Sequence, residues 1–304
     1  MRKEALNRVA ELVDEHPNVV FIGSDLGAGV LADAMEQFPS RVLMEGIAEQ
    51  HVVGMAAGLA LEGLIPFVHT IGTFLTRRSF EQVAMDCALH RLPVRLLASG
   101  GGMVYAPLGP THQAIEDFAL MRAIPGMSII APIDPQEMEE ALTALVQYPG
   151  PAYIRMGKGG ENIVTERGFA IGRARVLHQG SDVLLISTGV LGHECLAAAE
   201  LLSADGIAVQ LVHVPCVAPL DEDFLLAQIT RFKHVLVVEE HVPSGGLWTA
   251  LVEVMMRNQV STIIRQRALP PTYASSYGSQ SDHWGLARLN AQWIAEDVRE
   301  MVKG

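Results

Sequence analysis

Short runs rich in β-branched residues alternate with helical stretches along almost the whole chain, and this alternation constrains the fold more than any other feature. Such alternation is typical of parallel sheets covered by helices. The predicted strands are Val19–Gly23, Arg41–Met44, Ile65–His69, Val94–Ala98, Ser128–Ala131, Ala152–Arg155, Val183–Ser187, Ala208–Val214, Val235–Glu239 and Thr262–Arg265. The predicted helices are Met1–His16, Gly46–Glu62, Phe74–His90, Thr111–Ala123, Pro135–Gln147, Gly192–Ser203, Asp221–Thr230, Gly246–Arg257 and Asn290–Val302. We therefore predict an α/β fold of two domains, each with a mainly parallel sheet covered by helices.

The chain divides at a glycine-rich stretch of weak periodicity, Met156–Gly180, which separates the earlier predicted strands from the later ones. A chain of 304 residues is long enough for two domains of ordinary size. We expect a first domain at residues 1–165, a linker at 166–180 and a second domain at 181–304.

Composition excludes several classes of protein. The chain has 34 acidic and 22 basic residues, a net charge of −12 and no basic run, so nucleic-acid binding, which depends on Lys and Arg, is not expected. No apolar stretch approaches the roughly 20 residues of a membrane span, and the first residues are predicted to form a helix, not a signal peptide. The three cysteines lack CxxC spacing, which argues against disulfides or a zinc site and favours a reducing, cytoplasmic compartment.

In parallel sheets the chemistry lies beyond the carboxyl ends of the strands, so the residues that follow the predicted strands are the first candidates for a functional site. These candidates are Asp25, Glu45, Glu49, Thr70–Phe74, Ser99–Gly102, Pro132 and Lys158. Charged and aromatic side chains at this edge can reach a ligand that is bound across several strands.

The segment MEGIAEQHVVGMAAGLALEG contains the most unusual predicted helix, because its alanines and glycines leave hardly any side-chain bulk. Such a helix is tolerated mainly where another backbone approaches closely, as at a tight subunit interface. Glu49 falls in its first turn, at the end of a strand. A glutamate in a first turn ordinarily caps the helix or is solvated, but the packed surroundings favour a functional carboxyl group here.

Phe74 follows a Gly-Thr turn at the end of the third predicted strand. It is either a core residue or a flat surface for a heteroaromatic ring. Phe80 lies six residues further on, a spacing that does not place it on the same helical face. The adjacent Arg77 and Arg78 indicate a partly wet surface, with one arginine available to pair with an acid across an interface.

The glycine-rich loop Ser99–Asp117 runs into the helix predicted to start at Thr111, and its glycines allow close approach of the backbone. His112 then stands at the helix start, where it is either a structural hydrogen-bonding residue or a catalytic one. The sequence has no GxGxxG, P-loop, HExxH, GxSxG or calcium-loop motif, and its histidines lack metal-ligand spacing.

Three segments in order, MEGIAEQHVVGMAAGLALEG, GTFLTRRSFEQV and GPTHQAIEDFALMRAIPGMSIIAPID, resemble the pyrimidine-binding domain of transketolases and deoxyxylulose-phosphate synthases. The segments VLLISTG and VEEHVPSGGLW resemble the C-terminal domain of the same family. The resemblance covers nearly all of the chain and is close to the separately encoded C-terminal halves of two-subunit transketolases. It implies a transferase that uses thiamine diphosphate to move a two-carbon ketol unit from a ketose to an aldose.

The resemblance also implies a role for each matching residue. Glu49 corresponds to the catalytic glutamate that hydrogen-bonds the cofactor's aminopyrimidine and starts its proton relay. Phe74 corresponds to the aromatic residue that packs on the pyrimidine, Phe80 to a second wall of that pocket, and Asp25 to an aspartate near the thiazolium. His112 corresponds to the histidine that contacts the hydroxyl and carbonyl end of the donor substrate.

In this family the diphosphate is bound through Mg²⁺ held by a GDG…N motif in a separate amino-terminal domain. No GDG occurs in this sequence, and the nearest pattern, Ala204-Asp205-Gly206, falls at a predicted helix end. The resemblance therefore implies a partner subunit that carries the diphosphate-binding domain and holds Mg²⁺, with the cofactor shared between the two subunits. We also expect self-association across the pyrimidine domain, which together with the partner gives a heterotetramer.

The acceptor side departs from that of an ordinary transketolase. Arg2 and Lys158 stand where the family has basic residues for the terminal phosphate of the sugar phosphate. Gly29 and Gly100 replace a serine and a histidine that bind the same phosphate, and Leu108 replaces an aspartate that binds a substrate hydroxyl. Losing a hydrogen-bonding partner changes substrate discrimination strongly, so we expect a non-standard sugar.

Two alternatives stay open at this point. The FLxRxxxQV spacing favours a relative that synthesises deoxyxylulose phosphate, with the β subunit of a 2-oxoacid dehydrogenase as a further relative, whereas the missing cofactor domain and HQAIED after Thr111 favour transketolase. A hypothesis of another class is a non-catalytic partner subunit. The presence of Glu49, Phe74 and His112 argues against it.

Overall fold

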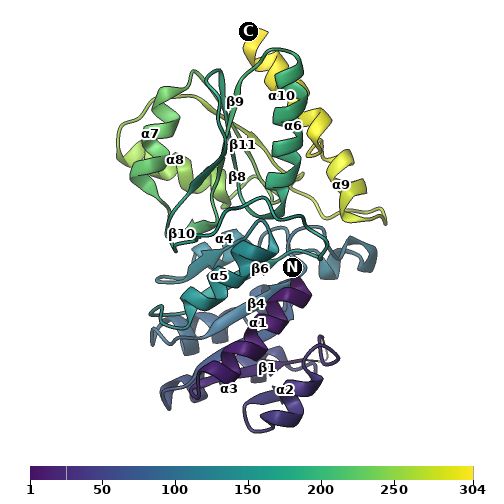
Figure 1. Ribbon diagram of the computed structural model, residues 1–304, viewed down its shortest axis with the longest axis vertical. Helices are drawn as coiled ribbons and strands as arrows, with labels where there is room; N and C mark the ends of the chain where they lie inside the picture. Colours follow the sequence, from purple (N-terminus) through teal and green to yellow (C-terminus); the bar gives the residue numbers. More distant parts are fainter. Residues whose placement is uncertain (25, 304) are drawn as a thin grey trace.

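The computed structural model describes residues 1–24 and 26–303. It contains two sheets, each flanked by helices, which lie one above the other along the long axis of the molecule (Figure 1). All but one of the neighbouring strand pairs within each sheet are parallel. The predicted α/β fold with two mainly parallel, helix-covered sheets is therefore confirmed.

The first sheet has the strand order β10-β5-β6-β4-β3-β1-β2. Its strands are β1 (Val19–Gly23), β2 (Val42–Met44), β3 (Ile65–Ile71), β4 (Arg95–Ser99), β5 (Ser128–Ile130), β6 (Ala152–Met156) and β10 (Cys216–Ala218). The chain continues from β1 to β2 on one side and then crosses back to β3 on the other. Such a reversal opens a crevice beyond the carboxyl ends of the two diverging strands, here β1 and β3.

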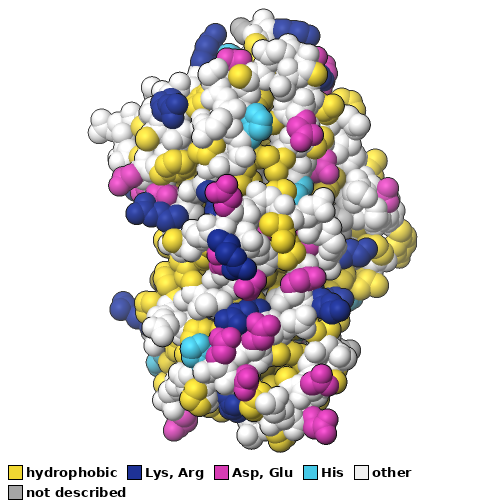
Figure 2. Space-filling view, viewed as in Figure 1, with side chains coloured by type: hydrophobic (Ala, Val, Ile, Leu, Met, Phe, Trp, Pro, Cys, Tyr) yellow, Lys and Arg dark blue, Asp and Glu magenta, His cyan; other side chains and the backbone are white. Residues whose placement is uncertain are grey.

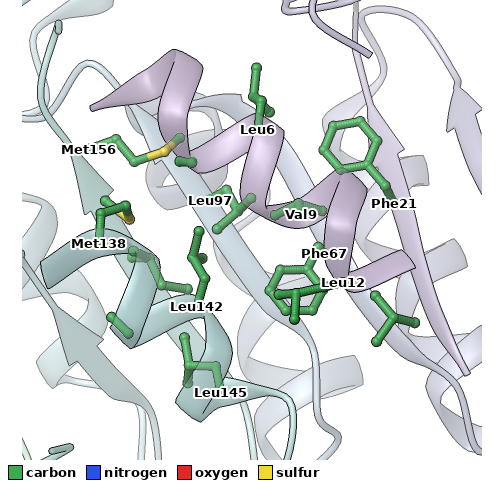
Figure 3. Packing of buried hydrophobic residues seen from close by; sticks show 14 of the residues in the cluster. Leu6, Val9, Leu12, Phe21, Phe67, Leu97, Met138, Leu142, Leu145 and Met156 are labelled. Atoms are coloured by element: carbon green, nitrogen blue, oxygen red, sulfur yellow. The ribbon is translucent and has the colours of Figure 1, made fainter. Parts of the chain in front are cut away.

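Helices cover both faces of the first sheet. They are α1 (Arg2–Glu15), α2 (Ala32–Gln37), α3 (Glu49–Leu61), α4 (Asp117–Arg122), α5 (Pro135–Leu145), the π-helical segments Phe74–Arg78 and Gln82–Ala88, and the 3₁₀ turns Ala106–Leu108 and Pro110–His112. Leucines of α1 and α5 pack over Phe21, Phe67 and Leu97 of the strands (Figure 3). On the opposite face, α3, α4 and the second π-helical segment enclose a separate apolar cluster.

The second sheet has the order β12-β11-β8-β9-β7. Its strands are β7 (Arg175–His178), β8 (Val183–Ser187), β9 (Val209–His213), β11 (His234–Val238) and β12 (Ile264–Arg267). Its helices are the 3₁₀ turn Gly189–Leu191, α6 (Gly192–Ala204), α7 (Glu222–Arg231), α8 (Leu247–Arg257), α9 (Gln280–Leu286) and α10 (Ala291–Lys303). One apolar cluster joins α6 and α10 to the sheet, and another joins α7 and α8 to its other face.

Each predicted strand is present, but the short elements α2, β7, β10 and α9 were not among those expected. The expected linker, residues 166–180, contains β7, which pairs antiparallel with β9 at the edge of the second sheet. β10 pairs antiparallel with β5, so the second half of the chain adds an edge strand to the first sheet. Both strands have three or four residues and depend on partners distant in sequence, which leaves little local signal.

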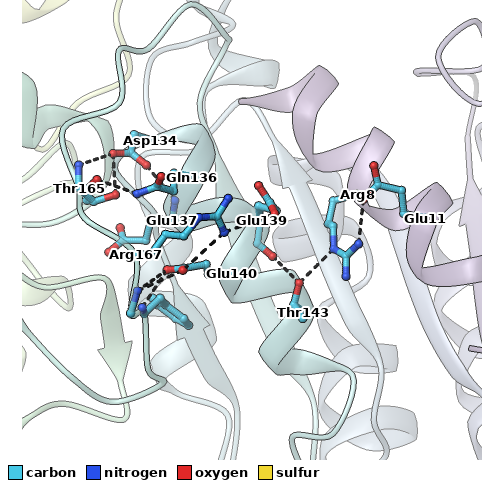
Figure 4. A network of polar contacts seen from close by, with 12 residues as sticks. Arg8, Glu11, Asp134, Gln136, Glu137, Glu139, Glu140, Thr143, Thr165 and Arg167 are labelled. Carbon is cyan, nitrogen blue, oxygen red and sulfur yellow. Dashed lines mark hydrogen bonds and ion pairs between the residues drawn. The ribbon is translucent and has the colours of Figure 1, made fainter. Parts of the chain in front are cut away.

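A polar network holds the chain between the sheets against α5 (Figure 4). Asp134 caps α5 by accepting from the Glu137 N–H at 2.8 Å, and it also accepts from Thr165. Burial opposes the charge of Asp134, but these hydrogen bonds lower the pKa of its carboxyl overall. Glu140 accepts from the backbone of Gly168 and Phe169. This connecting segment is therefore fixed to the first domain.

The visible surface carries mixed charges. Acidic and basic side chains are interspersed on the face in Figure 2 and do not gather into one basic patch. Within the described residues, no helix has the length and apolar character needed to cross a membrane.

The packing of α1 against α5 predicts a large cost for Leu142→Ala, because Leu142 is fully buried in that layer. We expect a loss of about 2–5 kcal/mol in the free energy of unfolding. Leu201→Ala on α6 is the matched control, since Leu201 is 42% exposed and its truncation leaves no cavity. Urea unfolding monitored by circular dichroism checks both variants, and equal losses would contradict the observed packing.

Candidate active site

The carboxyl ends of β2, β3 and β4 bring the predicted site residues to one edge of the first sheet. Glu49 is the first residue of α3, after β2; Phe74 starts the π-helical segment after β3; and His112 ends the 3₁₀ turn in the loop after β4. These three residues are distant in sequence, but Arg78 interacts with each of them. It forms an ion pair with Glu49, lies over the Phe74 ring, and its charge lowers the pKa of His112.

Glu49 is a buried acid with a single charged neighbour in the described part of the chain. Its side chain is 3% exposed, and its Oε2 accepts from Arg78 Nη1 at 2.5 Å. The Arg78 side chain is 43% exposed, so this ion pair joins a buried carboxylate to a cation at the surface. Arg78 thereby compensates a charge that would be costly to bury alone.

Phe74 provides a flat aromatic surface beside this pair. The guanidinium carbon of Arg78 lies 4.2 Å from the centre of the Phe74 ring. The His112 ring meets Phe74 edge-on, at 5.3 Å between centroids and an interplanar angle of 69°. Burial and the nearby charge of Arg78 lower the pKa of His112, which favours a neutral ring at pH 7. The site thus combines a buried acid, an aromatic face and a neutral imidazole.

Arg77 and Arg78 pair within the chain, with Glu116 and Glu49 respectively, and pairing of one arginine across an interface stays a prediction. One expectation about this region is wrong. The segment from Phe74 is π-helical where an ordinary helix was predicted, and π-helical turns are frequent at functional sites.

His112 also does not stand at the start of an α-helix. After it, Gln113 is extended, and Ala114 exchanges backbone hydrogen bonds with Gly102 at 3.0 Å. The helix α4 begins only at Asp117, because the intervening backbone is used to pair with the glycine-rich loop. The predicted helix Thr111–Ala123 therefore starts too early, since α4 begins only at Asp117.

The acceptor-side residues lie around the start of α1. Arg2 donates from Nη1 to the Tyr105 hydroxyl at 2.9 Å, and Lys158 lies exposed in the loop that follows β6. A Cβ atom placed on Gly100 would come within 2.1 Å of the Tyr105 ring. The ring of Tyr105 therefore fills the space that any larger residue at position 100 would need. Sequence reasoning did not single out Tyr105, since only the folded loop places it there.

The other acceptor-side positions are open. A Cβ atom on Gly29 would meet nothing within 4 Å, and Leu108 is 55% exposed. Neither position offers a polar side chain to a substrate.

Phe80 lies apart from this group, and Asp25 is outside the described residues. Phe80 is half-buried against the cluster under α3, and lines a groove with Ala84, Met85 and Leu89. Glu49 and Phe74 are not among the residues that line this groove.

The second domain reaches the same loop. Ala274 N–H donates to Gln113 Oε1 at 3.2 Å, and the Arg77 guanidinium lies 5.4 Å from the centre of the Tyr273 ring. Val242 N–H donates to the Ile115 carbonyl at 2.8 Å. These contacts fix the loop after His112 between the two domains. The arrangement is that of a two-domain α/β protein whose candidate site residues lie at a strand reversal, the place where such folds bind ligands.

Comparison with known proteins identifies the family. Residues 1–160 match the transketolase pyrimidine-binding domain, and residues 172–288 match the transketolase C-terminal domain. A protein of Methanocaldococcus jannaschii, provisionally named a transketolase C-terminal section, is 32% identical over 100% of this chain and 96% of its own length. A 1-deoxy-D-xylulose-5-phosphate synthase of Anaeromyxobacter sp. (strain K) is 36% identical over 97% of this chain. The chain belongs to the transketolase family.

The chain spans 47% of the length of that synthase. Among solved structures, a split-gene transketolase described as an inactive β4 tetramer is similar with a TM-score of 0.91 and 30% identity, covering 99% of this chain and 98% of that one. The transketolase of Campylobacter jejuni has the same fold, with a TM-score of 0.81 at 18% identity over 46% of its own chain.

The family depends on thiamine diphosphate, and the residues present fit the pyrimidine part of that cofactor. An aminopyrimidine needs a hydrogen-bonding partner for a ring nitrogen and a flat apolar surface. Arg78 shows that a planar group can donate to Glu49 and stack on Phe74 at the same time. Within residues 1–24 and 26–303, no three His, Cys, Asp or Glu side chains gather as a metal site would require.

The buried His69, on β3, gives the folding stability of the chain a pH dependence. Its Nδ1–H donates to the Leu26 carbonyl at 3.2 Å, and its Nε2 accepts from the Ser99 hydroxyl at 2.8 Å. Burial lowers the pKa of His69 from 6.5 to about 4, so the folded chain keeps this ring neutral. The unfolded chain takes up a proton below pH 6.5, and the stability contributed by neutral His69 is lost as the pH falls from 6.5 to 4.

We predict that lowering the pH from 7 to 5 costs wild type about 2 kcal/mol more unfolding free energy than His69→Gln, which cannot take up this proton. Denaturant unfolding at both pH values measures the difference. His51→Gln is the control, because His51 is exposed. An equal pH dependence of wild type and His69→Gln would show that His69 is not held neutral.

Proposed function

We propose that this chain is the C-terminal subunit of a thiamine-diphosphate-dependent transketolase that transfers a two-carbon ketol unit from a ketose phosphate to an aldose phosphate. The observation that carries the proposal is the buried Glu49 beside Phe74 and His112 at the reversal between β1 and β3. Further support comes from the similarity to a transketolase C-terminal section over nearly the whole of both chains.

Thiamine diphosphate supplies the carbanion chemistry of the reaction, and the protein supplies binding, orientation and proton transfer. Glu49 holds a proton at its carboxyl oxygen against a pyrimidine ring nitrogen, away from water because the side chain is buried. Phe74 supports the ring face. His112, as a neutral imidazole, has one nitrogen that donates and one that accepts, which suits the hydroxyl and carbonyl of a donor sugar. Asp25 is proposed as a further cofactor contact, as the family resemblance implies, whereas Phe80 lines a separate groove and is left out of this pocket.

We further propose that the diphosphate and Mg²⁺ are held by an amino-terminal partner subunit, in a heterotetramer of two copies of each chain. The sequence has no GDG motif, and the related split-gene transketolase is described as inactive when it forms a β4 tetramer. The described chain has three buried free cysteines, which suits the reducing cytoplasm.

On the acceptor side, Arg2 and Lys158 are the proposed contacts for a terminal phosphate. Tyr105 replaces the missing side chain at Gly100, which supports a sugar other than the standard pentose phosphates. Domains are proposed at 1–165 and 181–304, with a linker at 166–180 whose strand β7 pairs with β9 of the second domain.

Calorimetric titration of thiamine diphosphate with Mg²⁺ tests the shared site. We expect no binding by this chain alone and clear binding after the amino-terminal subunit is added. Glu49→Gln should retain complex formation but lower the turnover by about 10²–10⁴-fold, because the carboxyl proton is lost. Glu62→Gln, at the exposed end of α3, is the control. Tight binding by the isolated chain would contradict the shared site, and a fully active Glu49→Gln complex would indicate a non-catalytic subunit.

Synthesis of deoxyxylulose phosphate is the second candidate, favoured by the 36% identity to the synthase. The two functions differ in whether the transferred two-carbon unit carries a hydroxyl. Hydroxypyruvate and pyruvate are simple donors with and without it. For a transketolase, His112→Ala should lower kcat/KM for hydroxypyruvate by about 10–10²-fold, through loss of a hydrogen bond to the hydroxyl. Preference of the wild-type complex for pyruvate would support the synthase instead.

A further inference from the structure

Arg78 contacts both of the side chains that the proposed function assigns to the pyrimidine ring. Its guanidinium is planar, donates to Glu49 Oε2 at 2.5 Å and lies 4.2 Å from the centre of the Phe74 ring. An aminopyrimidine in this place needs the same two side chains, because its ring nitrogen accepts a hydrogen bond from the Glu49 carboxyl group and its face packs on Phe74. A single side chain therefore occupies the position of the ring.

The two partners of this ion pair differ in their freedom to move. Glu49 is 3% exposed and lies at the start of α3, so it cannot reach water without moving the helix. Arg78 is 43% exposed, is the last residue of its π-helical segment and has a long flexible stem. The guanidinium can thus leave into solvent while Glu49 and Phe74 stay in place.

Removing Arg78 without a replacement would leave the Glu49 charge buried and unpaired, which is costly. A neutral ring does not pair with that charge, so the ring replaces Arg78 only when the Glu49 carboxyl carries the proton that it donates to the ring nitrogen. The charge of Arg78 also contributes to the lowered pKa of His112, so its departure changes the electrostatics at a second site residue.

We propose that Arg78 is an internal counter-ion that fills the pyrimidine position of the free chain and must be displaced when thiamine diphosphate enters. This inference rests on the proposed function. Displacement subtracts the Arg78–Glu49 and Arg78–Phe74 interactions from the affinity for the cofactor. Arg78 therefore weakens cofactor binding while it protects the free chain from an unpaired buried acid.

The test compares thiamine diphosphate dissociation constants, at saturating Mg²⁺, for complexes with the amino-terminal subunit that contain wild type, Arg78→Ala or Arg78→Lys. Arg78→Ala should bind about five- to tenfold more tightly than wild type, since a partly exposed pair is worth about 1 kcal/mol. Arg78→Lys, which keeps the charge but loses the planar stacking group, should fall between them and guards against misfolding of the alanine variant. Arg231→Ala is the matched control, because the Arg231 guanidinium lies 5.8 Å from the Phe232 ring in the second domain.

If Arg78 instead served to hold Glu49 in position, its replacement would disorder the Glu49 side chain and weaken cofactor binding. Unchanged or weaker binding by both Arg78 variants, with normal binding by wild type, would overturn the inference and leave the proposed function intact. Absence of binding by wild type and both variants, in a complex that forms normally, would overturn the proposed function and the inference with it.

Discussion

The shared direction of the strands from β1 to β6 is the constraint on which the candidate site depends. These strands pair in parallel with one another, so their carboxyl ends lie along one edge of the first sheet. Loops that are far apart in sequence then meet there, and the reversal of strand order at β1 and β3 leaves space between them. Glu49, Phe74 and His112 come together for this reason.

The second domain completes this edge. β10 pairs with β5, and the backbone of Val242 and Ala274 holds the loop that follows His112. The first domain also holds this loop, because Gly102 pairs with Ala114 and Arg155 donates to the Ala114 carbonyl at 3.1 Å, so both domains position it. The C-terminal domain therefore has a structural part in shaping the site, even though each residue proposed to bind the cofactor or the substrate lies in the first domain.

The strands were predictable because each is a compact β-branched run, and the carboxyl-edge rule led directly to Glu49 and Phe74. The pairing of Arg78 with Glu49 was not predictable, because it spans 29 positions and depends on a π-helical turn. Tyr105 was missed for a similar reason, since its ring approaches Gly100 only when the loop folds back. The sequence analysis missed contacts between segments that are distant in sequence, because the periodicity of hydrophobic residues does not encode them.

Two buried acids show how this chain separates structural from functional charge. Glu240 accepts from the Met103 N–H, from Gln280 and from the Trp284 indole N–H, at 2.8 to 3.0 Å, and burial raises the pKa of its carboxyl. These donors come from several elements, so Glu240 is fixed in place. Glu49 instead has one charged partner, on a side chain that can leave. Glu49 therefore depends on a single exchangeable partner, whereas several fixed donors would have to be broken before Glu240 could bind another group.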